Sequence, residues 1–286
     1  MQIAVVTGAS SGIGYSVTNE LADRGYVVYA CARRVDRIDP LVLKHGSDKV
    51  KSIKLDISQY DEIKAFKEFL QGEQIDGKLD LLYNNAGQSC SLPALDVTDD
   101  ILQQCFAVNV FGHVNMTREL SPLLIKSQGT IVFTGSVSGL VSMPFITTYS
   151  STKAALHQYA RGLHLEMKPF GVRVINAITG GVKTEIYSAT PFPDDSVHHF
   201  KEQIDAFQSR NKGIPMMPSD VYAKQMVDVI MGSSDSVDIY KGSYARVIKF
   251  VALFVPAWLL TYVLYRTTGL NKVEKETRRQ DKNKKD

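Results

Sequence analysis

The amino-acid sequence predicts a doubly wound α/β fold, with a parallel sheet of about seven strands and helices on both of its faces. Three observations support this fold. Apolar, β-branched runs alternate with amphipathic helical stretches through about residue 245, the connections between them are short, and a glycine-rich turn follows the first run directly at Gly8–Gly14. Several of the runs are apolar throughout, as expected of strands that are buried on both faces.

The elements follow one another in a regular order along the chain. The expected strands are Ile3–Thr7, Val27–Cys31, Val50–Lys54, Leu79–Asn84, Thr130–Thr134 and Val172–Ala177, with a seventh near Asp238–Tyr240. The expected helices between them include Ile13–Arg24, Asp61–Leu70, Ile101–Ser121 and Ser151–Lys168. We therefore expect residues 1–245 to form one α/β domain.

Residues 184–218 break this alternation. The stretch contains prolines at positions 191, 193, 215 and 218, which favour a long loop with short helices. Long loops in compact domains are usually functional, so we expect a substrate-binding loop here. The alternative is a variable surface excursion.

Composition excludes several classes of protein. With 44% hydrophobic and 22% charged residues among 286, the chain is neither disordered nor a multi-span membrane protein. A net charge of +3 is too small to indicate nucleic-acid binding. The three cysteines, Cys31, Cys90 and Cys105, include no CxxC pair and predict reduced thiols in a cytosol-facing protein, and the six histidines lack the spacing of a metal site. The first apolar run leads into the glycine turn instead of a cleavage site, so no signal peptide is expected.

The glycine turn Gly8-Ala-Ser-Ser-Gly12-Ile-Gly14 predicts a dinucleotide site. Glycines let the backbone approach a pyrophosphate closely, and the N-terminus of the following helix offers free N–H groups and a positive dipole to that anion. The turn lies at the first strand–helix junction, where a Rossmann domain requires it. Ser10 lies inside the turn and is expected to contact the cofactor together with the glycines.

The residues after the second strand select the dinucleotide. An NAD site places a carboxylate there to bind the ribose 2′-hydroxyl, but this chain has Arg33 and Arg34. An arginine pair binds the 2′-phosphate of NADP, so the expected cofactor is NADPH. Asp56 ends the third strand and is placed to accept from the adenine amino group, with a turn cap as the alternative. Residues Asn84–Gly87 end the fourth strand and are expected to lie along the adenosine ribose.

Four polar side chains form the candidate catalytic set. Tyr149 and Lys153 lie one turn apart at the start of a helix and so share one face. The unperturbed pKa of a tyrosine is about 10, and a neighbouring ammonium favours the phenolate, so Tyr149 is expected to serve as general acid for carbonyl reduction. Ser136 follows the fifth strand and can hydrogen-bond a carbonyl oxygen, and Asn109 lies mid-helix, where an amide indicates a polar network.

As an ordered set, these motifs resemble the signature of the short-chain dehydrogenase/reductase family over residues 1–245. The resemblance implies hydride transfer from nicotinamide, with Tyr149 as proton donor and Ser136 as polariser of the substrate carbonyl. It implies that Lys153 binds ribose and that Asn109 holds a relay water. It further implies cofactor contacts from Ile13, Asp56, Asn85, Arg118, Val182 and Thr184.

One further expectation concerns self-association, and another concerns a segment that departs from the family pattern. By family analogy, the chain self-associates through the helices that contain Asn109 and Tyr149. After the sixth strand, Thr179-Gly180-Gly181 replaces the usual Pro-Gly, which alters the stiffness expected beside the nicotinamide.

Residues 246–266 form an apolar segment that is expected to bind a membrane. The uncharged run Phe250–Tyr265 has 16 residues, fewer than the ~20 of a spanning helix, and Pro256 kinks it near the middle. Basic residues flank the run on both sides, and its aromatic residues suit an interface. This pattern favours insertion into one bilayer leaflet or a lipid-droplet monolayer, and the alternatives are a tilted span, a buried helix or a dimer contact. Residues 267–286 are expected to be a solvated charged tail.

A membrane-bound reductase of this family implies a lipophilic ketone as substrate. We expect it at the endoplasmic reticulum membrane and on lipid droplets, with the reductase domain facing the cytosol. Steroids, retinal and 3-ketoacyl compounds are alternative substrates. If the substrate carries a phosphate, Lys201, Arg210 and Lys212 in the long loop are candidates to bind it.

Two other functions fit parts of the sequence. The segment Gly8–Gly12 also matches the G-x-S-x-G pattern of a lipase, with Ser10 as the nucleophile. The chain could also bind NADPH without turnover and serve as a membrane scaffold.

Overall fold

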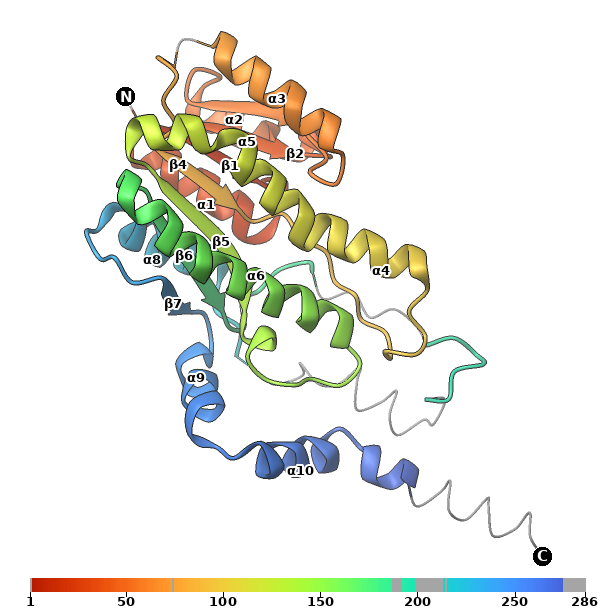
Figure 1. The fold of residues 1–286 in the computed structure, drawn as a ribbon. Coiled ribbons are helices and arrows are strands. Elements are labelled where there is room, and N and C mark those ends of the chain that lie inside the picture. Colours follow the sequence, from red (N-terminus) through yellow and green to blue (C-terminus); the bar gives the residue numbers. More distant parts are fainter. Residues whose placement is uncertain (1, 74, 187–191, 199–212, 214, 275–286) are drawn as a thin grey trace, which may run out of the picture.

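Seven parallel strands form the central sheet of the protein (Figure 1). The computed structural model describes residues 2–73, 75–186, 192–198, 213 and 215–274. The strands lie in the order β3-β2-β1-β4-β5-β6-β7. Their bounds are β1 Ile3–Thr7, β2 Val27–Ala32, β3 Val50–Lys54, β4 Leu81–Asn84, β5 Thr130–Ser136, β6 Arg173–Thr179 and β7 Asp238–Lys241. The predicted doubly wound sheet is confirmed, including its seventh strand.

Helices cover both faces of the sheet and enclose two hydrophobic cores. On one face lie α1 Gly12–Asp23, α2 Asp39–His45 and α8 Ser219–Met231, and on the other lie α3 Tyr60–Gly72, α5 Gly112–Ser127 and α6 Thr147–Met167. Successive side chains of each strand point to opposite faces. In β1, Val5 belongs to the core beneath α3, α5 and α6, whereas Ala4 and Val6 belong to the core beneath α1, α2 and α8. Burial on both faces explains why this strand is apolar throughout.

The strand order reverses at β1. Strand β2 pairs with one edge of β1 and β4 pairs with the other, so the chain winds outward in both directions from this point. In doubly wound sheets, ligands bind in the crevice at the carboxyl ends of the strands at such a switch point. The turn Gly8–Gly14, which follows β1, lies at this edge.

The helix expected over Ile101–Ser121 is three segments instead of one. The chain forms α4 from Asp99 to Phe106, a π-helical segment from Ala107 to Phe111, and then α5. A π segment inserts one extra residue per turn and is common at functional sites. Here it contains Asn109, whose buried side chain bonds outside its own helix. The sequence pattern did not reveal this interruption, because the apolar spacing changes little across it.

The apolar C-terminal segment forms two short helices that meet at Pro256. Helix α9 spans Ala245–Phe254 and α10 spans Ala257–Thr267, with Val255 extended between them. Proline lacks an N–H and disfavours helix in the residue before it, which accounts for the break. Helix α9 packs against β7 and the turn Val137–Gly139, and α10 extends away from the sheet (Figure 1). Among the described residues, no helix combines the length and the apolarity needed to cross a bilayer.

Candidate active site

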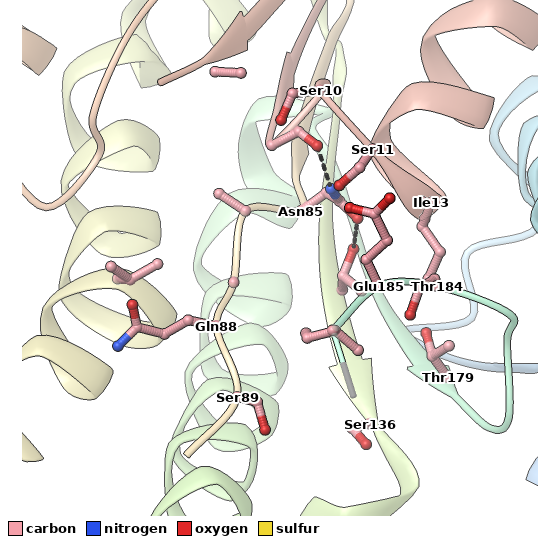
Figure 2. Close-up of a pocket in the computed structure, with 18 of the residues that line it drawn as sticks. Ser10, Ser11, Ile13, Asn85, Gln88, Ser89, Ser136, Thr179, Thr184 and Glu185 are labelled. Atoms are coloured by element: carbon pink, nitrogen blue, oxygen red, sulfur yellow. Dashed lines mark hydrogen bonds between the residues drawn. The ribbon is translucent and has the colours of Figure 1, made fainter. Parts of the chain in front are cut away.

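A cavity of about 400 Å³ opens at the carboxyl ends of the strands, between β1 and β4. Figure 2 shows Ser10, Ser11 and Ile13 of the glycine turn at one end of it, and Ser89 and Ser136 at the other. The expected site residues that line the cavity are Gly8, Ser10, Gly12, Ile13, Arg33, Arg34, Asp56, Asn85, Ser136, Tyr149, Lys153, Val182 and Thr184. Gly14, Asn109 and Arg118 do not line it. The structure thus brings residues from seven separate stretches of the chain to one cavity.

The glycine turn is shaped to leave backbone N–H groups open. Gly8 adopts a φ of +67°, and a Cβ there would lie 2.7 Å from the Ala86 Cα atom. A Cβ at Gly14 would lie 2.3 Å from the Gly8 carbonyl oxygen, so Gly14 packs behind the cavity and lets the turn close against α1. Ser11 precedes α1 without capping it through its side chain. The helix therefore presents free N–H groups and its positive dipole end to the cavity, which suits a pyrophosphate.

Arg33, Arg34 and Asp56 lie together at the far end of the cavity. Both arginines are exposed, and Arg33 Nη1 lies 3.9 Å from the Asp56 carboxylate. The other carboxylate oxygen of Asp56 accepts hydrogen bonds from the Ser58 N–H at 3.0 Å and the Ser58 hydroxyl at 2.7 Å. One carboxylate oxygen of Asp56 therefore caps a turn, and the other lies near Arg33. The turn cap is the role expected from the sequence as the alternative to binding adenine. Both guanidinium groups are exposed to solvent, where they can meet an anion.

Asn85 braces the wall of the cavity from within. Its amide nitrogen donates to the Thr7 carbonyl at 3.0 Å, and its amide oxygen accepts from the Thr134 hydroxyl at 3.3 Å. The Thr7 hydroxyl in turn accepts from the Asn85 and Ala86 N–H groups at 2.9 and 3.1 Å. These bonds join the ends of β1, β4 and β5. The Asn85 side chain therefore holds three strands together, and Asn85 also lines the cavity.

Helix α6 carries Tyr149 and Lys153 on the face that borders the cavity. Lys153 is 2% exposed, and its ammonium donates to the Thr134 carbonyl at 2.8 Å. The same nitrogen lies 5.6 Å from the centre of the Tyr149 ring. Burial lowers the pKa of Lys153 to about 8. At neutral pH the lysine is therefore still mostly charged, close to the tyrosine it is expected to assist.

Ser136 is held as a hydrogen-bond donor. Its hydroxyl oxygen accepts from the Ser138 N–H at 3.2 Å and from the Ser138 hydroxyl at 2.9 Å. A hydroxyl has two acceptor positions and one hydrogen. Because Ser138 fills both acceptor positions, the hydrogen of Ser136 remains for a partner in the cavity. This is the arrangement needed to polarise a carbonyl oxygen.

Asn109 supports the cavity wall from behind. Its amide oxygen accepts from the Gln88 N–H at 2.9 Å, and its amide nitrogen donates to the Gln88 carbonyl at 3.0 Å and to the Thr152 hydroxyl at 3.2 Å. The residue is fully buried. The Asn109 side chain does not line the cavity. It holds the backbone of Gln88, which does. The polar network expected around this amide is present.

Arg118 is the expected cofactor contact that the structure places elsewhere. It lies on the exposed side of α5, where its guanidinium covers the Tyr60 ring at 5.1 Å and its Nε lies 3.4 Å from Glu119. It follows Asn109 by nine residues, about two and a half helical turns, so the two side chains point in opposite directions. Arg118 therefore does not line the cavity, and its contact with the cofactor stays a prediction.

The segment Thr179-Gly180-Gly181 is stiffened by its neighbours. The Thr179 hydroxyl donates to the Ala177 carbonyl at 3.0 Å and meets the buried Tyr222 hydroxyl at 2.7 Å. The Gly180 N–H donates to the Lys241 carbonyl at 2.8 Å, and a Cβ at Gly180 would lie 2.2 Å from the Ser243 carbonyl oxygen. Side-chain and backbone bonds to α8 and β7 thus replace the stiffness that proline would supply.

Two buried histidines beside the site were not expected from the sequence. His113 Nε2 lies 2.7 Å from the Ala86 carbonyl, and burial lowers the pKa of His113 to about 3, so the neutral ring donates to that carbonyl. His157 contacts the backbone of Ser136. Both residues sit on helices at positions that look like ordinary core positions, and no local pattern marks them. Among the described residues, no group of acidic, histidine or cysteine side chains is arranged to bind a metal ion.

The chain belongs to the short-chain dehydrogenase family. The family model, described as short chain dehydrogenase, matches residues 2–191. Over 288 aligned positions, the chain is 58% identical to the NADPH-dependent 1-acyldihydroxyacetone phosphate reductase of Saccharomyces cerevisiae, covering 100% of this chain and 97% of the yeast protein.

Two solved structures share the fold over almost the whole chain. A short-chain dehydrogenase from Streptomyces avermitilis superposes with a TM-score of 0.78 at 26% identity, covering 96% of this chain and 98% of that one. A short chain dehydrogenase from Burkholderia cenocepacia in complex with NADP gives a TM-score of 0.72 at 26% identity, covering 92% of this chain and 99% of that one.

Proposed function

We propose that the protein is an NADPH-dependent reductase of a lipophilic ketone, and that its substrate is 1-acyldihydroxyacetone phosphate, which it reduces to 1-acylglycerol 3-phosphate. One observation carries the proposal: a single cavity has Arg33 and Arg34 at one end and Ser136, Tyr149 and Lys153 at the other. The yeast relative that is 58% identical bears the name of this activity. The solved relative from Burkholderia cenocepacia binds NADP.

The residues present fit NADPH. The open N-terminus of α1 and the glycine turn suit the pyrophosphate, and Arg33 and Arg34 suit the 2′-phosphate. The buried ammonium of Lys153 is placed to bind ribose hydroxyls at the other end. When bound, NADPH supplies the hydride that the protein itself lacks.

The side chains at the reacting end supply the proton and hold the ketone. The Ser136 hydroxyl donates to the ketone oxygen, because its own acceptor positions are filled by Ser138. Tyr149 then gives its phenolic proton to the same oxygen as it becomes an alkoxide. The Lys153 ammonium stabilises the phenolate left behind. The ketone gains a hydride at carbon and a proton at oxygen, which balances the reduction to an alcohol.

We also propose that α9 and α10 hold the protein on a lipid surface, at the endoplasmic reticulum membrane and on lipid droplets, with the reductase domain toward the cytosol. Phe250, Phe254 and Trp258 are 61%, 68% and 71% exposed, which is unusual for large apolar side chains. Basic residues flank them at Arg246 and Arg266, as anionic lipid headgroups favour. Because α9 packs against the turn that follows Ser136, a lipid surface there would border the substrate end of the site.

Detergent-solubilised protein tests the reaction directly. Consumption of NADPH should be fastest with 1-acyldihydroxyacetone phosphate, slow with dihydroxyacetone phosphate lacking the acyl chain, and slow with a steroid ketone, retinal or a 3-ketoacyl compound. Tyr149→Phe should lose at least about a thousandfold in kcat, because the general acid is gone. The proposed substrate is wrong if it is ignored while a steroid turns over well. Unchanged turnover by Tyr149→Phe would overturn the proposed chemistry.

Apart from its match to the G-x-S-x-G pattern, nothing supports the interpretation of the glycine turn as a lipase site. Among the residues that the structure describes, no histidine or carboxylate bonds to Ser10, and Ser10 lies in the turn suited to pyrophosphate.

The cations expected to meet a substrate phosphate, Lys201, Arg210 and Lys212, lie outside the described residues.

A further inference from the structure

His157 lies on α6 one turn beyond Lys153, and its ring contacts the backbone of Ser136. The Ser136 N–H donates to His157 Nε2 at 3.1 Å, and His157 is 2% exposed. A neutral imidazole that accepts at Nε2 carries its proton on Nδ1. Within the described part of the chain, that Nδ1 has no hydrogen-bond partner. A buried polar nitrogen without a partner costs free energy, so stability alone does not explain a histidine at this position.

Two glycines make room for the ring. A Cβ at Gly135 would lie 2.6 Å from His157 Nε2, and a Cβ at Gly139 would lie 2.8 Å from its Cε1. Gly135 directly precedes Ser136, and Gly139 ends the turn that follows it. The imidazole therefore fills the space behind the serine, and a side chain at either glycine would displace it.

The surroundings of the ring keep it neutral. Burial lowers the pKa of His157 to about 4, and the cations Lys153 and Arg161, one turn before and one turn after it on α6, act in the same direction. Asp238 of β7 opposes them, but its carboxylate is bound by Arg161 at 2.9 and 3.1 Å. Nε2 therefore remains an acceptor at physiological pH.

We propose that His157 is a positioning residue for Ser136: by accepting the serine N–H, it fixes the main chain from which the hydroxyl meets the substrate oxygen. The inference rests on the proposed role of Ser136 in ketone reduction. Ser138 occupies the acceptor positions of the hydroxyl, and His157 holds the backbone behind it. Together they determine where the remaining hydroxyl hydrogen points. Without the ring, the Ser136 N–H loses its buried acceptor and the hydroxyl is no longer held in one place.

Kinetics of His157→Leu test the proposal. We expect kcat to fall about 10- to 100-fold, as for the misplacement of a catalytic group, while the KM for the ketone and the Kd for NADPH change less than about threefold. His157→Gln should recover part of kcat, because its amide oxygen can accept the N–H. Gly135→Ala should reproduce the loss by displacing the ring. Leu156→Val, at the buried neighbour of His157, is the control for general loss of packing and should keep kcat within about twofold.

A double-mutant cycle separates a positioning role from a structural one. In a Ser136→Ala background, His157→Leu should lower kcat by no more than about twofold, because no hydroxyl is left to position. An equal loss in both backgrounds would overturn the proposal, as would wild-type kcat in folded His157→Leu. If Tyr149→Phe were also fully active, the proposed reductase reaction itself would fail. If His157→Leu lowered kcat equally with and without Ser136→Ala while Tyr149→Phe was inactive, only the positioning role of His157 would be rejected.

Nuclear magnetic resonance gives a readout that needs no turnover. In detergent-solubilised protein with ¹⁵N-labelled histidine, His157 is expected as the neutral tautomer with its proton on Nδ1, at pH 7 and still at pH 5. Assignment is made by comparison with His157→Gln. A ring protonated on Nε2 at pH 7 would contradict the acceptor role.

Discussion

Asn109 and Gln88 exchange two hydrogen bonds: the amide of Asn109 accepts the Gln88 N–H at 2.9 Å and donates to the Gln88 carbonyl at 3.0 Å. The side-chain amide of Asn109 thus accepts from and donates to the backbone of one residue, as paired residues of neighbouring strands do. The exchange fastens the segment after β4, which lines the cavity, to the π-helical segment before α5. A carboxylate cannot replace it, because it has no N–H to donate.

The first prediction follows from this pairing. Asn109→Asp places a carboxylate oxygen against the Gln88 carbonyl in a fully buried position, so the free energy of unfolding should fall by about 2 kcal/mol or more at pH 7. Urea denaturation measures the change. Asn115→Asp on α5, which is only partly buried, is the matched control and should change stability by less than about 0.5 kcal/mol. Equal losses in the two variants would show that the pairing is not the cause.

The second prediction concerns the choice between NADPH and NADH. Replacing both Arg33 and Arg34 by serine removes the guanidinium groups that we expect to bind the 2′-phosphate. Bonds between charged groups contribute about 1.5–3 kcal/mol each, so kcat/KM for NADPH should fall at least about 100-fold while kcat/KM for NADH changes little. Lys44→Ser, which removes an exposed cation on α2 that is paired with Asp23, should leave the ratio unchanged. A preserved preference for NADPH would place the recognition of the 2′-phosphate elsewhere.

The third prediction is a loss of NADPH affinity at alkaline pH. Burial lowers the pKa of Lys153 to about 8 in the protein without NADPH, so its ammonium is lost as pH rises through that value. The ribose and phosphates of NADPH favour the charged form, so the Kd for NADPH should increase from pH 8 to pH 9.5. Fluorescence titration of bound NADPH measures it. Lys153→Met should bind more weakly at pH 7 and show a flatter profile, and an equally steep profile would exclude Lys153 as its source.

The fourth prediction is that stability decreases in mild acid because of the two buried histidines. Burial lowers the pKa of His157 to about 4 and that of His113 to about 3, whereas both titrate near 6.5 in the unfolded chain. The unfolded state therefore binds more protons between pH 6.5 and these values, so the free energy of unfolding falls as pH falls through this window. From pH 7 to pH 5 the loss should be about 2 kcal/mol per histidine.

Denaturant unfolding at pH 7 and at pH 5 checks this dependence. His113→Gln and His157→Gln should each lower stability at pH 7 but reduce the difference between the two pH values. Replacement of the partly buried Asn115 by glutamine, which neither adds nor removes a titrating group, should leave that difference unchanged. A pH dependence that survives in both buried-histidine variants would point to other groups.

The fifth prediction concerns the lipid surface. Trp258 is the single tryptophan of the chain and is 71% exposed. Its fluorescence should shift to shorter wavelength when the protein is mixed with phosphatidylcholine vesicles that contain phosphatidylinositol. Phe250→Ser with Phe254→Ser removes two exposed apolar rings, each worth roughly 2 kcal/mol on burial, so vesicle affinity should fall about 100-fold or more.

Two comparisons complete the test of the lipid surface. Leu43→Ser removes an exposed apolar side chain on α2, a helix that lies far from α9 and α10 (Figure 1). This variant should bind vesicles like the unaltered protein. In cells, removal of residues 246–286 should move the protein to the soluble fraction. Retention on membranes after that removal would reject α9 and α10 as the binding element.

Local features were predictable and long-range ones were not. The strands Ile3–Thr7 and Val50–Lys54 occur with the expected bounds, because each expectation rests on a run of consecutive residues. The first strand is buried throughout, whereas only Val50 is buried in the second. The shared face of Tyr149 and Lys153 follows from one helical turn. The expected single helix through Asn109 was wrong in detail, because the apolar spacing changes little across the π-helical segment that interrupts it. The cofactor contact expected of Arg118 stays a prediction, because this side chain lies outside the cavity and a family pattern does not state which way a helix face points.

The order of apolar runs, the glycines after the first of them, and the arginines after the second are properties of consecutive residues, and they alone specified a doubly wound sheet with a dinucleotide site. The tertiary structure decided which side chains stand behind that site. It placed His157 against Ser136, Asn109 against Gln88, and Tyr222 against Thr179, pairs separated by 21 to 43 positions. Such contacts depend on how α6, α8 and the π-helical segment before α5 pack on the sheet, so no local sequence pattern contains them.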